Sequence, residues 1–545
     1  MTSRRQFRVL EIKYYIWEKV KFIVLNYMHD APMTMLCASL AAGDAKGMVG
    51  AARDARRGGA DIVEVRLDRL RRITAPMIAR LARSIDFIPA VATLRPEWEG
   101  GAFEGSEDER VRLLGAAAGS GFDYMDLEIG MDAGFRSSLL GICKDGGVRT
   151  IVSHHDHLGT PGVREIVQII ERCTALGDIG KVAFLCSSAE DAAKVVEAAG
   201  KARRKGLAFV AIGMGEKGML TRLLAPIMGS AIAYACLDGR HRTAGGQPQI
   251  GDLLKMWGGP ARRRGLSHRT ALYGIIGHPL GHSLSPLMHN ASFKRLGMDA
   301  IYMPFDVKEE DIMGTLLALR AAGLRGANVT IPHKQTIMAL LDEIDGAASE
   351  IGAVNTIVNR GGRLRGSNTD IGGFVGALKG AGVRLRGARV LVIGAGGAAR
   401  AAVRGLLGEG ASVTVANRTV PRALELKESL GAARIDVAGL EAIPEILRHA
   451  DILVNCTPAG MRGFSAKNPV PARLLRRGLV VMDMVYNPVR TPLLAAAEKA
   501  GAITISGLEM FIRQGMGSFR TWTKKTLPIA EVRKVLAGSG MLGTT

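Results

Sequence analysis

The chain has 545 residues, a formal net charge of +21, 47% hydrophobic residues and 23% charged residues. Its length predicts roughly two to four domains, and its composition is that of ordinary soluble globular proteins. No apolar run reaches the ~18 residues of a membrane-spanning helix, so we expect no membrane segment.

The positive charge allows two interpretations, nucleic-acid binding or a surface that attracts small anionic substrates. The Arg residues are scattered rather than clustered with aromatic residues, and only "ARRRG" (261–265) forms a short basic run. We therefore expect small anionic substrates and no nucleic-acid partner. Salt-dependent binding to duplex DNA would favour the alternative.

The N-terminal extension, residues 1–32, mixes charged and apolar residues and lacks the apolar core and cleavage site of a secretory signal. It contains Glu11, Glu18 and Asp30, which are unusual in a transit peptide. Met33 and Met35 follow directly, so a misplaced start is an alternative reading. None of the 6 cysteines forms a C-x-x-C pair, which indicates free thiols in a reducing compartment. We expect a cytoplasmic protein.

Short apolar runs alternate with helix-like segments over residues 33–258. Eight such alternations predict a single (β/α)8 barrel, with a doubly wound open sheet as the alternative. In a barrel, the chemistry lies at the C-terminal ends of the strands. The runs are "TMLCASL" (34–40), "DIVEVRL" (61–67), "IPAVATL" (88–94), "FDYMDLEI" (122–129), "RTIVSHH" (149–155), "KVAFLCS" (181–187), "LAFVAIG" (207–213) and "AIAYACL" (231–237).

Polar residues gather at these expected strand ends. Residues two apart on a strand share a face, as Glu64 and Arg66 do, and Asp126 and Glu128 do. A lysine that faces a barrel interior needs a reason, since burying an unpaired charge is costly. The further polar residues are Arg95, Glu99, Lys181, Arg222 and Gln247.

The stretch "TIVSHHDHLGTP" (150–161) places His154, His155, Asp156 and His157 at the end of the fifth run. Adjacent residues of a strand point to opposite faces, so at most two of the four can face one site. A metal site would need several converging ligands.

The cationic side chains near this site disfavour a divalent cation, and we predict no metal. They suit an anionic substrate and a lysine that is neutral often enough to attack a ketone and form a Schiff base. His155 then becomes the proton-transfer group. The cations are Arg66, Arg95, Lys181 and Arg222.

Residues 33–256 resemble the type I 3-dehydroquinate dehydratases. The motifs occur in the family's order at matching strand ends. One departure is "RTAGGQ" (242–247), where the family usually has Ser-Ala-Pro-Gly-Gln; Thr243 keeps a hydroxyl, but the proline is missing. The matching motifs are "GADIVEVRLDR", "TLRPEWEGG", "DYMDLE", "VSHHDH", "GDIGKVAF" and "GMGEKGMLTR".

This resemblance implies a role for each residue of the set. Lys181 would form an imine with the substrate ketone, and His155, oriented by Glu99, would remove the adjacent proton. It gives no catalytic role to His154, Asp156 or His157. In the remaining roles, Glu64, Arg66 and Arg95 would line the site, Arg222 would hold the substrate carboxylate, Thr243 would belong to the closing loop, and Gln247 would contact hydroxyls.

A linker at 259–270 separates the barrel from a second half with a different pattern of expected strands and helices. "RVLVIGAGGAARAAVRGLLGEGASVTVANRT" (389–419) reads as strand, Gly-rich turn, helix and strand, which is a dinucleotide-binding unit. Its turn would bring the backbone close to a pyrophosphate at a helix N-terminus. The turn residues are Gly394, Ala395, Gly396, Gly397 and Ala398.

The second half resembles the shikimate dehydrogenases from about residue 271 to 545. The motifs are "GHPLGHSLSPLMHN", "GANVTIPHK", "GAVNTIV", "GSNTDIGGF", "VNCTPAGM", "VYNPVRTPLL" and "GLEMFIRQG". The resemblance implies a substrate-binding domain at 271–370, a Rossmann NADP-binding domain at 371–505, and C-terminal helices at 506–545 that return to the substrate domain.

The same resemblance implies that Lys334 and Asp370 act as a pair at the reacting oxygen, where ketone reduction needs a proton donor. Ser283 and Ser285 would bind the substrate carboxylate. The substrate hydroxyls would be surrounded by Asn328, Thr330, Asn355, Tyr486 and Gln514.

The cofactor preference can be read from the end of the second strand of the dinucleotide unit. NAD-specific folds usually carry Asp or Glu there to bind the ribose 2′-hydroxyl. This chain has Asn417, Arg418 and Thr419, and Arg418 suits a 2′-phosphate. We therefore expect NADP.

Together these readings predict two fused enzymes, a lyase and an oxidoreductase, that catalyse successive steps of aromatic biosynthesis. The barrel would convert 3-dehydroquinate to 3-dehydroshikimate, and the second half would reduce that product to shikimate with NADPH. A quinate-directed dehydrogenase is the alternative, disfavoured by the presence of both Ser283 and Ser285.

Overall fold

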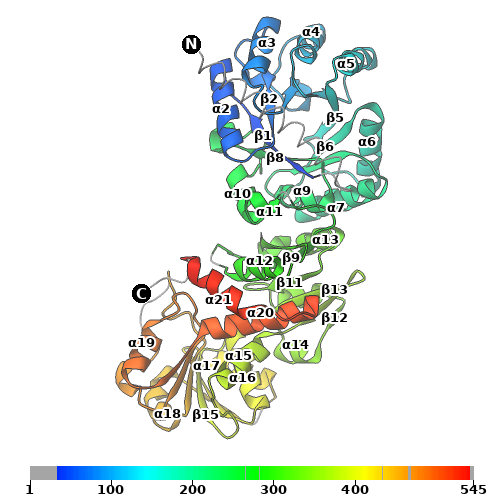
Figure 1. Cartoon of the computed structure of the whole chain (residues 1–545). Helices are drawn as coiled ribbons and strands as arrows, with labels where there is room; N and C mark the ends of the chain where they lie inside the picture. The colour runs from blue at the N-terminus through cyan, green and yellow to red at the C-terminus, as the bar shows by residue number, and fades with distance from the viewer. Residues whose placement is uncertain (1–32, 264, 282, 432–433, 464–467, 541–545) are drawn as a thin grey trace, which may run out of the picture. The chain divides into compact units, whose positions relative to one another are not determined.

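The computed structural model describes residues 33–540, except 264, 282, 432–433 and 464–467. The predicted extension 1–32 and residues 541–545 lie outside the described residues. The described chain divides into two compact units. The first runs up to Ala271 and includes Glu310–Gly323, and the second combines Leu272–Glu309 with the chain from Leu324 onward (Figure 1).

The first unit is a parallel β-barrel, as predicted. Its eight strands are hydrogen-bonded in the order β7-β6-β5-β4-β3-β2-β1-β8. The two end strands nearly close the ring, because the backbone N–H of Ala231 donates to the carbonyl of Phe209 at 2.8 Å. The strands are β1 (Met35–Leu40), β2 (Ile62–Arg66), β3 (Ala90–Thr93), β4 (Tyr124–Glu128), β5 (Arg149–Asp156), β6 (Ile179–Leu185), β7 (Phe209–Met214) and β8 (Ile232–Cys236).

Helices follow the strands and bury one apolar face each, as the alternating pattern requires. Several begin at a side chain that accepts a backbone N–H, such as Asp44, Ser106, Asp132 and Ser188. The helices are α2 (Ala45–Arg57), α3 (Ala75–Ser84), α4 (Glu107–Ala118), α5 (Ala133–Asp145), α6 (Val163–Leu176), α7 (Ala189–Arg204), α8 (Met219–Leu223), α9 (Ala225–Met228) and α10 (Ile250–Met256).

The basic segment after α10 contains a short helix, α11 (Pro260–Arg263). Arg263 is buried, and its Nη2 lies 2.8 Å from Oδ1 of Asp61. Part of the predicted linker is therefore attached to the barrel by a partly buried ion pair. Helix α13 (Ile312–Ala321), which lies further along the chain, also groups with the first unit and packs against α7.

The second unit contains two six-stranded sheets. The first has the order β10-β9-β11-β13-β14-β12, with β13 antiparallel to its neighbours. Its strands are β9 (Ala271–Gly277), β10 (Ala300–Asp306), β11 (Gly326–Val329), β12 (Glu343–Ile344), β13 (Thr356–Arg360) and β14 (Arg363–Ser367).

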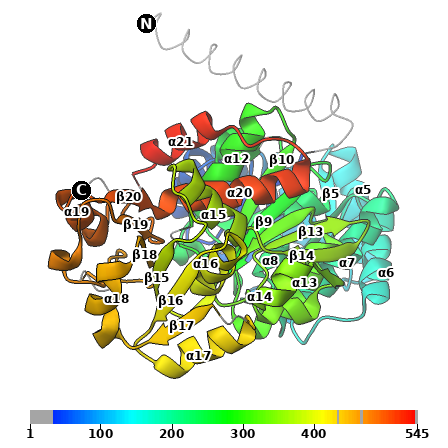
Figure 2. The ribbon, with the colours of Figure 1, turned by 90° about the horizontal axis from the view of Figure 1, so that it is seen from below.

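The second sheet is fully parallel in the order β17-β16-β15-β18-β19-β20, which is the doubly wound dinucleotide-binding arrangement predicted (Figure 2). Apolar clusters lie on both faces of this sheet. The strands are β15 (Arg389–Ile393), β16 (Ser412–Ala416), β17 (Ile435–Ala438), β18 (Ile452–Asn455), β19 (Val480–Asp483) and β20 (Ile503–Ser506).

The two sheets are joined by helices that cross between them. Helix α15 (Asp370–Gly380) packs against both α16 (Gly397–Gly408) and α20 (Gly507–Thr523). Helix α20 also contacts β13, and α21 (Ile529–Gly538) packs on α12 (Ser285–Arg295). The C-terminal helices therefore lie against the first sheet, although they follow the second in sequence.

Candidate active sites

The barrel interior is layered, because residues two apart on each strand point the same way. The lower layer is apolar and includes Cys37, Ile62, Val91, Tyr124 and Ile151. Two positions further along the same strands the inward side chains become polar. This upper layer contains Ser39, Glu64, Thr93, Asp126, Ser153 and Lys181, all buried. A cavity open to solvent lies above it.

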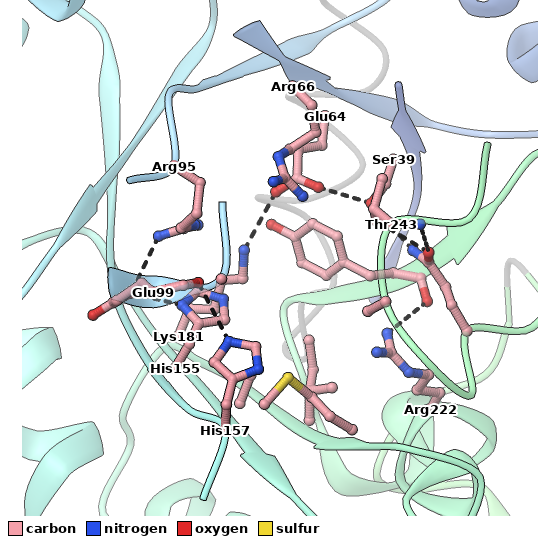
Figure 3. A pocket seen from close by; sticks show the side chains of 17 residues that line it. Ser39, Glu64, Arg66, Arg95, Glu99, His155, His157, Lys181, Arg222 and Thr243 are labelled. Carbon is pink, nitrogen blue, oxygen red and sulfur yellow. Dashed lines mark hydrogen bonds and ion pairs between the residues drawn. The ribbon is translucent and has the colours of Figure 1, made fainter. Parts of the chain in front are cut away.

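Lys181 lies at the base of this cavity with its side chain only 4% exposed (Figure 3). Its Nζ lies 2.8 Å from Oδ2 of Asp126 and 3.4 Å from Oε1 of Glu64. It also lies 4.4 Å from the ring centroid of Tyr234. The two carboxylates explain how a lysine is accommodated inside the barrel, because a buried ammonium requires partners.

His155 faces the cavity from β5, and its Nδ1 lies 2.8 Å from Oε2 of Glu99 (Figure 3). Burial, aided by the positive charges of Arg95 and Lys181, holds the pKa of His155 well below its ordinary value. Burial also raises the pKa of Glu99 to about 8, although Arg95 opposes the shift. The pair is thus a neutral imidazole held by a carboxyl group, and Nε2 of the imidazole can accept a proton once Glu99 is ionised.

The four predicted cations are not equivalent. The charge of Arg66 is neutralised by a bidentate ion pair with Asp68, in which Nε and Nη2 lie 2.8 and 2.7 Å from the carboxylate oxygens. Arg95 lies 2.9 Å from Asp126 and 2.7 Å from Glu128. With Lys181 also paired, most of the positive charge that suggested an anionic substrate is compensated internally.

Arg222 is the exception among these cations, since no carboxylate among the described residues lies within ion-pair distance of it. It is buried, its Nη1 donates to the backbone oxygen of Tyr234 at 3.2 Å, and its Nε has no hydrogen-bond partner in the described chain. Burial lowers the pKa of Arg222 to about 10, and Glu64 partly offsets this, so the guanidinium stays charged at neutral pH. Such a group is ready to receive an anion.

The loop after β8 is tied into the cavity by a chain of hydrogen bonds. The backbone N–H and Oγ1 of Thr243 donate to Oε1 of Gln247 at 3.0 and 3.1 Å. Nε2 of Gln247 donates to Ser39 at 3.2 Å, and Ser39 donates to Glu64 at 2.7 Å. Both Thr243 and Gln247 therefore line the cavity, and Thr243 makes these contacts in a loop that lacks the family's proline.

The residues next to His155 in the sequence make structural contacts. The ring of His154 packs against the ring of Phe184, with centroids 5.8 Å apart. Asp156 accepts a hydrogen bond from the backbone N–H of Leu158 at 2.8 Å in a turn. His157 lines the cavity, and its Nε2 lies 3.3 Å from the backbone oxygen of Glu99. A Cβ on Gly100 would lie 2.4 Å from that ring, so glycine is needed there.

Sequence reasoning gave no role to several residues that complete this site. Asp126 is the nearest partner of Lys181, and Tyr234 lies against it. Arg110, from the outer helix α4, is fully buried and contacts Glu128 at 2.5 Å. The alternation on β4 had marked Asp126 without giving it a role, and the alternation on β8 could have revealed Tyr234, whereas no local signal marks an arginine that reaches in from a helix.

In the second unit, Lys334 and Asp370 form the predicted pair. Nζ of Lys334 lies 2.6 Å from Oδ2 of Asp370, and Nδ2 of Asn355 donates to the other carboxylate oxygen at 2.7 Å. The side chain of Lys334 is 23% exposed and that of Asp370 is 10% exposed. Asp370 begins α15, and Lys334 follows β11, so two connections of the first sheet meet at this point.

Asn328 and Asn355 belong to one buried network. Oδ1 of Asn328 accepts from Tyr302 at 2.7 Å, and its Nδ2 donates to Ser518 at 2.8 Å and to the backbone oxygen of Asn355 at 3.2 Å. Ser518 lies 2.8 Å from Oγ1 of Thr356, which donates to Asn355 at 2.8 Å. Both amide hydrogens of Asn328 are therefore engaged, whereas Asn355 can still donate one.

The remaining predicted substrate residues make separate contacts. Ser283 is partly exposed and accepts the backbone N–H of Ser285, which is buried, at 3.4 Å. Tyr486 stacks on Phe511 with centroids 5.1 Å apart. Thr330 follows β11, its backbone N–H donating to Ile276 at 2.9 Å, and Gln514 lies on α20, donating to the backbone oxygen of Phe511 at 2.9 Å.

The dinucleotide turn fits a pyrophosphate. Gly394 has φ of +109°, a conformation that favours glycine, and a Cβ there would lie 3.2 Å from Thr457. A Cβ on Gly396 or Gly397 would meet nothing within 4 Å, and no side chain caps the N-terminus of α16. The backbone from Gly394 to Ala398 is thus open to a phosphate group.

The end of β16 fits a 2′-phosphate. Asn417 donates to the backbone oxygen of Thr419 at 2.8 Å, and this turn leads into α17 (Val420–Ser429). Arg418 and Arg422 are exposed there, and no acidic residue follows β16 directly. The donors suit an additional anion rather than a bare ribose hydroxyl. Sequence reasoning had not included Arg422.

Two further findings concern the described residues only. No group of three or more His, Cys, Asp and Glu side chains in the described ranges is arranged to hold a metal ion. None of the helices in those ranges has the length and apolar character that crossing a membrane would require.

Four family models match the chain. The type I 3-dehydroquinase model matches residues 36–258. The shikimate dehydrogenase substrate-binding domain matches 275–357, the shikimate/quinate 5-dehydrogenase model 377–484, and the shikimate 5′-dehydrogenase C-terminal domain 507–537.

Individual proteins show the same division. A "bifunctional 3-dehydroquinate dehydratase/shikimate dehydrogenase, chloroplastic" of Arabidopsis thaliana is 36% identical over 91% of this chain and 83% of its own length. An NADP(+) shikimate dehydrogenase of Methanothermobacter thermautotrophicus is 46% identical over 48% of this chain and 95% of its own length. A solved dehydroquinate dehydratase and shikimate dehydrogenase from S. pombe is 27% identical, covers 92% of this chain and 98% of its own, and has a TM-score of 0.42. The chain therefore belongs to the family of bifunctional 3-dehydroquinate dehydratase/shikimate dehydrogenases.

Proposed function

We propose that the barrel dehydrates 3-dehydroquinate to 3-dehydroshikimate and that the second unit reduces 3-dehydroshikimate to shikimate with NADPH. These are successive steps of the shikimate pathway, catalysed by a lyase and an oxidoreductase on one chain. The observation that carries the proposal is the barrel cavity, where a paired lysine, a neutral histidine and an uncompensated arginine face the same space.

Each group in the barrel has a step that suits it. Nζ of Lys181, once deprotonated, adds to the ketone carbon, and the ketone oxygen leaves as water to form an imine. The protonated imine draws electrons from the adjacent carbon, and His155 takes the proton from that carbon through Nε2. The resulting enamine electrons expel the hydroxyl on the next carbon, which leaves as water with the proton that His155 returns. Hydrolysis of the imine frees the product and Lys181.

The carboxylates support these steps from below the substrate. Asp126 holds Lys181 in place, and its own pKa stays low despite burial because Arg95 and Lys181 offset the desolvation. Glu99 fixes the ring of His155 through Nδ1 and leaves Nε2 for the substrate. We assign the substrate carboxylate to Arg222, the cavity arginine without a carboxylate partner in the described chain, while Arg66 and Arg95 shape the site through their own ion pairs. Gln247 faces the substrate hydroxyls.

In the second unit, Lys334 donates a proton at the reacting oxygen, and Asp370 keeps its ammonium group in position. NADPH, when bound, supplies the hydride. The turn Gly394–Ala398 and the side chains of Asn417, Arg418 and Thr419 would hold this cofactor. We assign the substrate carboxylate to Ser283 and Ser285, and the hydroxyls to Thr330, Asn355, Tyr486 and Gln514; Asn328 would support Asn355 from behind.

A coupled assay tests both halves at once. Purified chain given 3-dehydroquinate and NADPH should form shikimate and NADP+, with 3-dehydroshikimate as the intermediate. Quinate with NADP+ is the matched control, and faster oxidation of quinate than of shikimate would favour the alternative dehydrogenase. A cytoplasmic location and the absence of a nucleic-acid partner remain predictions that this assay does not address.

A further inference from the structure

Tyr234 occupies the middle of β8, in register with Cys37 of the apolar layer, and its side chain lines the cavity. It is 3% exposed, and it lines the cavity together with Lys181 and Arg222. Its hydroxyl oxygen is buried and has no hydrogen-bond partner among the described residues. A buried hydroxyl without a partner costs free energy, so its presence in this cavity calls for a reason.

The surroundings of Tyr234 place it beside both reactive ends of the site. Its ring lies under Nζ of Lys181, 4.4 Å from the centroid, and its backbone oxygen accepts from Arg222 at 3.2 Å. Among the residues that line the cavity and are described, the buried polar side-chain atoms without a partner are Nε of Arg222 and the hydroxyl of Tyr234. The polar residues of the upper layer are satisfied within the protein, as with Ser39, Glu64 and Asp126.

A second tyrosine in the same barrel shows that an unpartnered hydroxyl is not forced by the fold. Tyr124, on β4, belongs to the same apolar cluster as Tyr234 but does not line the cavity, and its hydroxyl accepts from Nη1 of Arg149 at 3.0 Å. Arg149 also stacks over its ring, with Cζ 5.1 Å from the centroid. The barrel thus satisfies a tyrosine away from the cavity and leaves the one inside it unpaired.

We propose that Tyr234 is a substrate-binding residue of the dehydratase, whose hydroxyl donates a hydrogen bond to the substrate hydroxyl on the carbon next to the imine carbon. The inference rests on the proposed function of the barrel. The imine carbon has two ring neighbours: His155, on β5, removes the proton from one, and we place the hydroxyl of Tyr234, on β8, beside the other. Burial and the charge of Glu64 raise the pKa of Tyr234 well above its ordinary value, so the phenol remains a donor at working pH.

The substitution Tyr234→Phe removes only the hydroxyl. Because the hydrogen bond is made to a part of the substrate that does not react, KM for 3-dehydroquinate should rise about tenfold while kcat changes little. The melting temperature of the ligand-free chain should stay the same or rise, because an unpaired buried hydroxyl is lost. A substrate analogue lacking the hydroxyl next to the ketone should bind wild type and variant equally.

Tyr124→Phe is the matched control. It should lower the melting temperature, because it removes the partner of Arg149, and it should leave KM unchanged. Reduction of 3-dehydroshikimate by NADPH should be the same in both variants. An unchanged KM in Tyr234→Phe, or a loss of activity accompanied by a lower melting temperature, would overturn the inference. A wild-type chain that does not dehydrate 3-dehydroquinate would instead overturn the proposed function.

Discussion

The two candidate active sites are both centred on a lysine, but they differ in how deeply the lysine is buried and in how many charged groups surround it. In the barrel, Lys181 is 4% exposed and shares a buried network with Asp126, Glu64, Arg95 and Glu128. In the second unit, Lys334 is 23% exposed and pairs with one carboxylate, behind which lie neutral amides and hydroxyls.

The difference fits the roles that we propose for the two lysines. A lysine that forms a covalent bond must be held in one orientation inside a closed space, and the buried charge this requires is balanced by further charges. A lysine that only donates a proton needs contact with the substrate oxygen, while the hydride comes from a cofactor. Neutral hydrogen-bonding groups then suffice to position its carboxylate partner.

The sharpest way to separate the two sites is to remove each lysine in turn. Lys181→Ala should reduce dehydration at least about 10⁴-fold and leave the reduction of 3-dehydroshikimate intact, because the covalent step is lost. Lys334→Ala should show the opposite pattern. Borohydride with 3-dehydroquinate should trap an adduct on Lys181, detected by mass spectrometry of peptides.

Lys194, which lies on the outer helix α7 and pairs with Asp191 at 2.8 Å, provides the control substitution for this experiment. Lys194→Ala should keep both activities and the adduct. Trapping on a different lysine, or an active Lys181→Ala, would show that the barrel does not use the mechanism proposed.

The histidines give the next largest effect. His155→Ala should lower dehydration about 10³-fold because the proton-transfer group is removed. His157→Ala should have a mild effect, because the hydrogen-bonding contact of its ring within the described chain is with the backbone oxygen of Glu99 and not with a side chain of the site. Steady-state dehydration rates of both variants decide this, and EDTA should change neither activity of the wild type. Activity lost to EDTA and restored by Zn²⁺ would point to a metal site instead.

A pH profile distinguishes the sites without any substitution. Below its raised pKa of about 8, Glu99 is protonated and donates to Nδ1 of His155, which puts the ring proton on Nε2 and blocks the base. Dehydration kcat/KM should therefore rise about tenfold per pH unit up to about pH 8 and then level off. Glu99→Gln should be slow and lack this inflection. A wild-type profile that is flat from about pH 6 to 9 would contradict the proton assignment.

The smallest expected effect concerns the cofactor. Arg418 can bind a 2′-phosphate through two charge-assisted hydrogen bonds, worth roughly 1.5 to 3 kcal/mol. Arg418→Ala should weaken NADPH about 10- to 100-fold, measured as the apparent KM, and leave NADH use and dehydration almost unchanged. An equal rise in the apparent KM for NADPH and NADH would mean that Arg418 does not bind the 2′-phosphate. A wild-type chain that prefers NADH would refute the cofactor assignment.

Much of this architecture could be predicted because it depends on local patterns. Eight apolar runs separated by amphipathic segments indicate a barrel, and a strand followed by a Gly-rich turn and a helix indicates a dinucleotide unit. The alternation on β2 and β4 correctly places Glu64 and Asp126 on inward faces. These signals survive without tertiary context because each arises within a few residues.

The pairing of charges could not be predicted in the same way. The sequence shows four cations near the barrel mouth, but only the structure shows that Asp68 neutralises Arg66 and that Arg222 has no such partner in the described chain. Arg110 reaches Glu128 from an outer helix, and Ser518 reaches Asn328 from 190 residues away along the chain. Such contacts depend on how elements pack, and no local pattern records them.

For this protein, the sequence pattern alone determined the order of the elements, the inward-facing Lys181 and the glycines of the cofactor turn, whereas Lys334 was indicated by the resemblance to the shikimate dehydrogenases. The first three features follow from periodicity and from backbone conformations that few residue types can adopt. Tertiary structure alone decided which arginine stays available for an anion, which asparagine has a spare donor, and which tyrosine hydroxyl is left unpaired. The physical reason is that hydrogen bonding and ion pairing are saturable, so a side chain's function depends on which partners the fold has already given it.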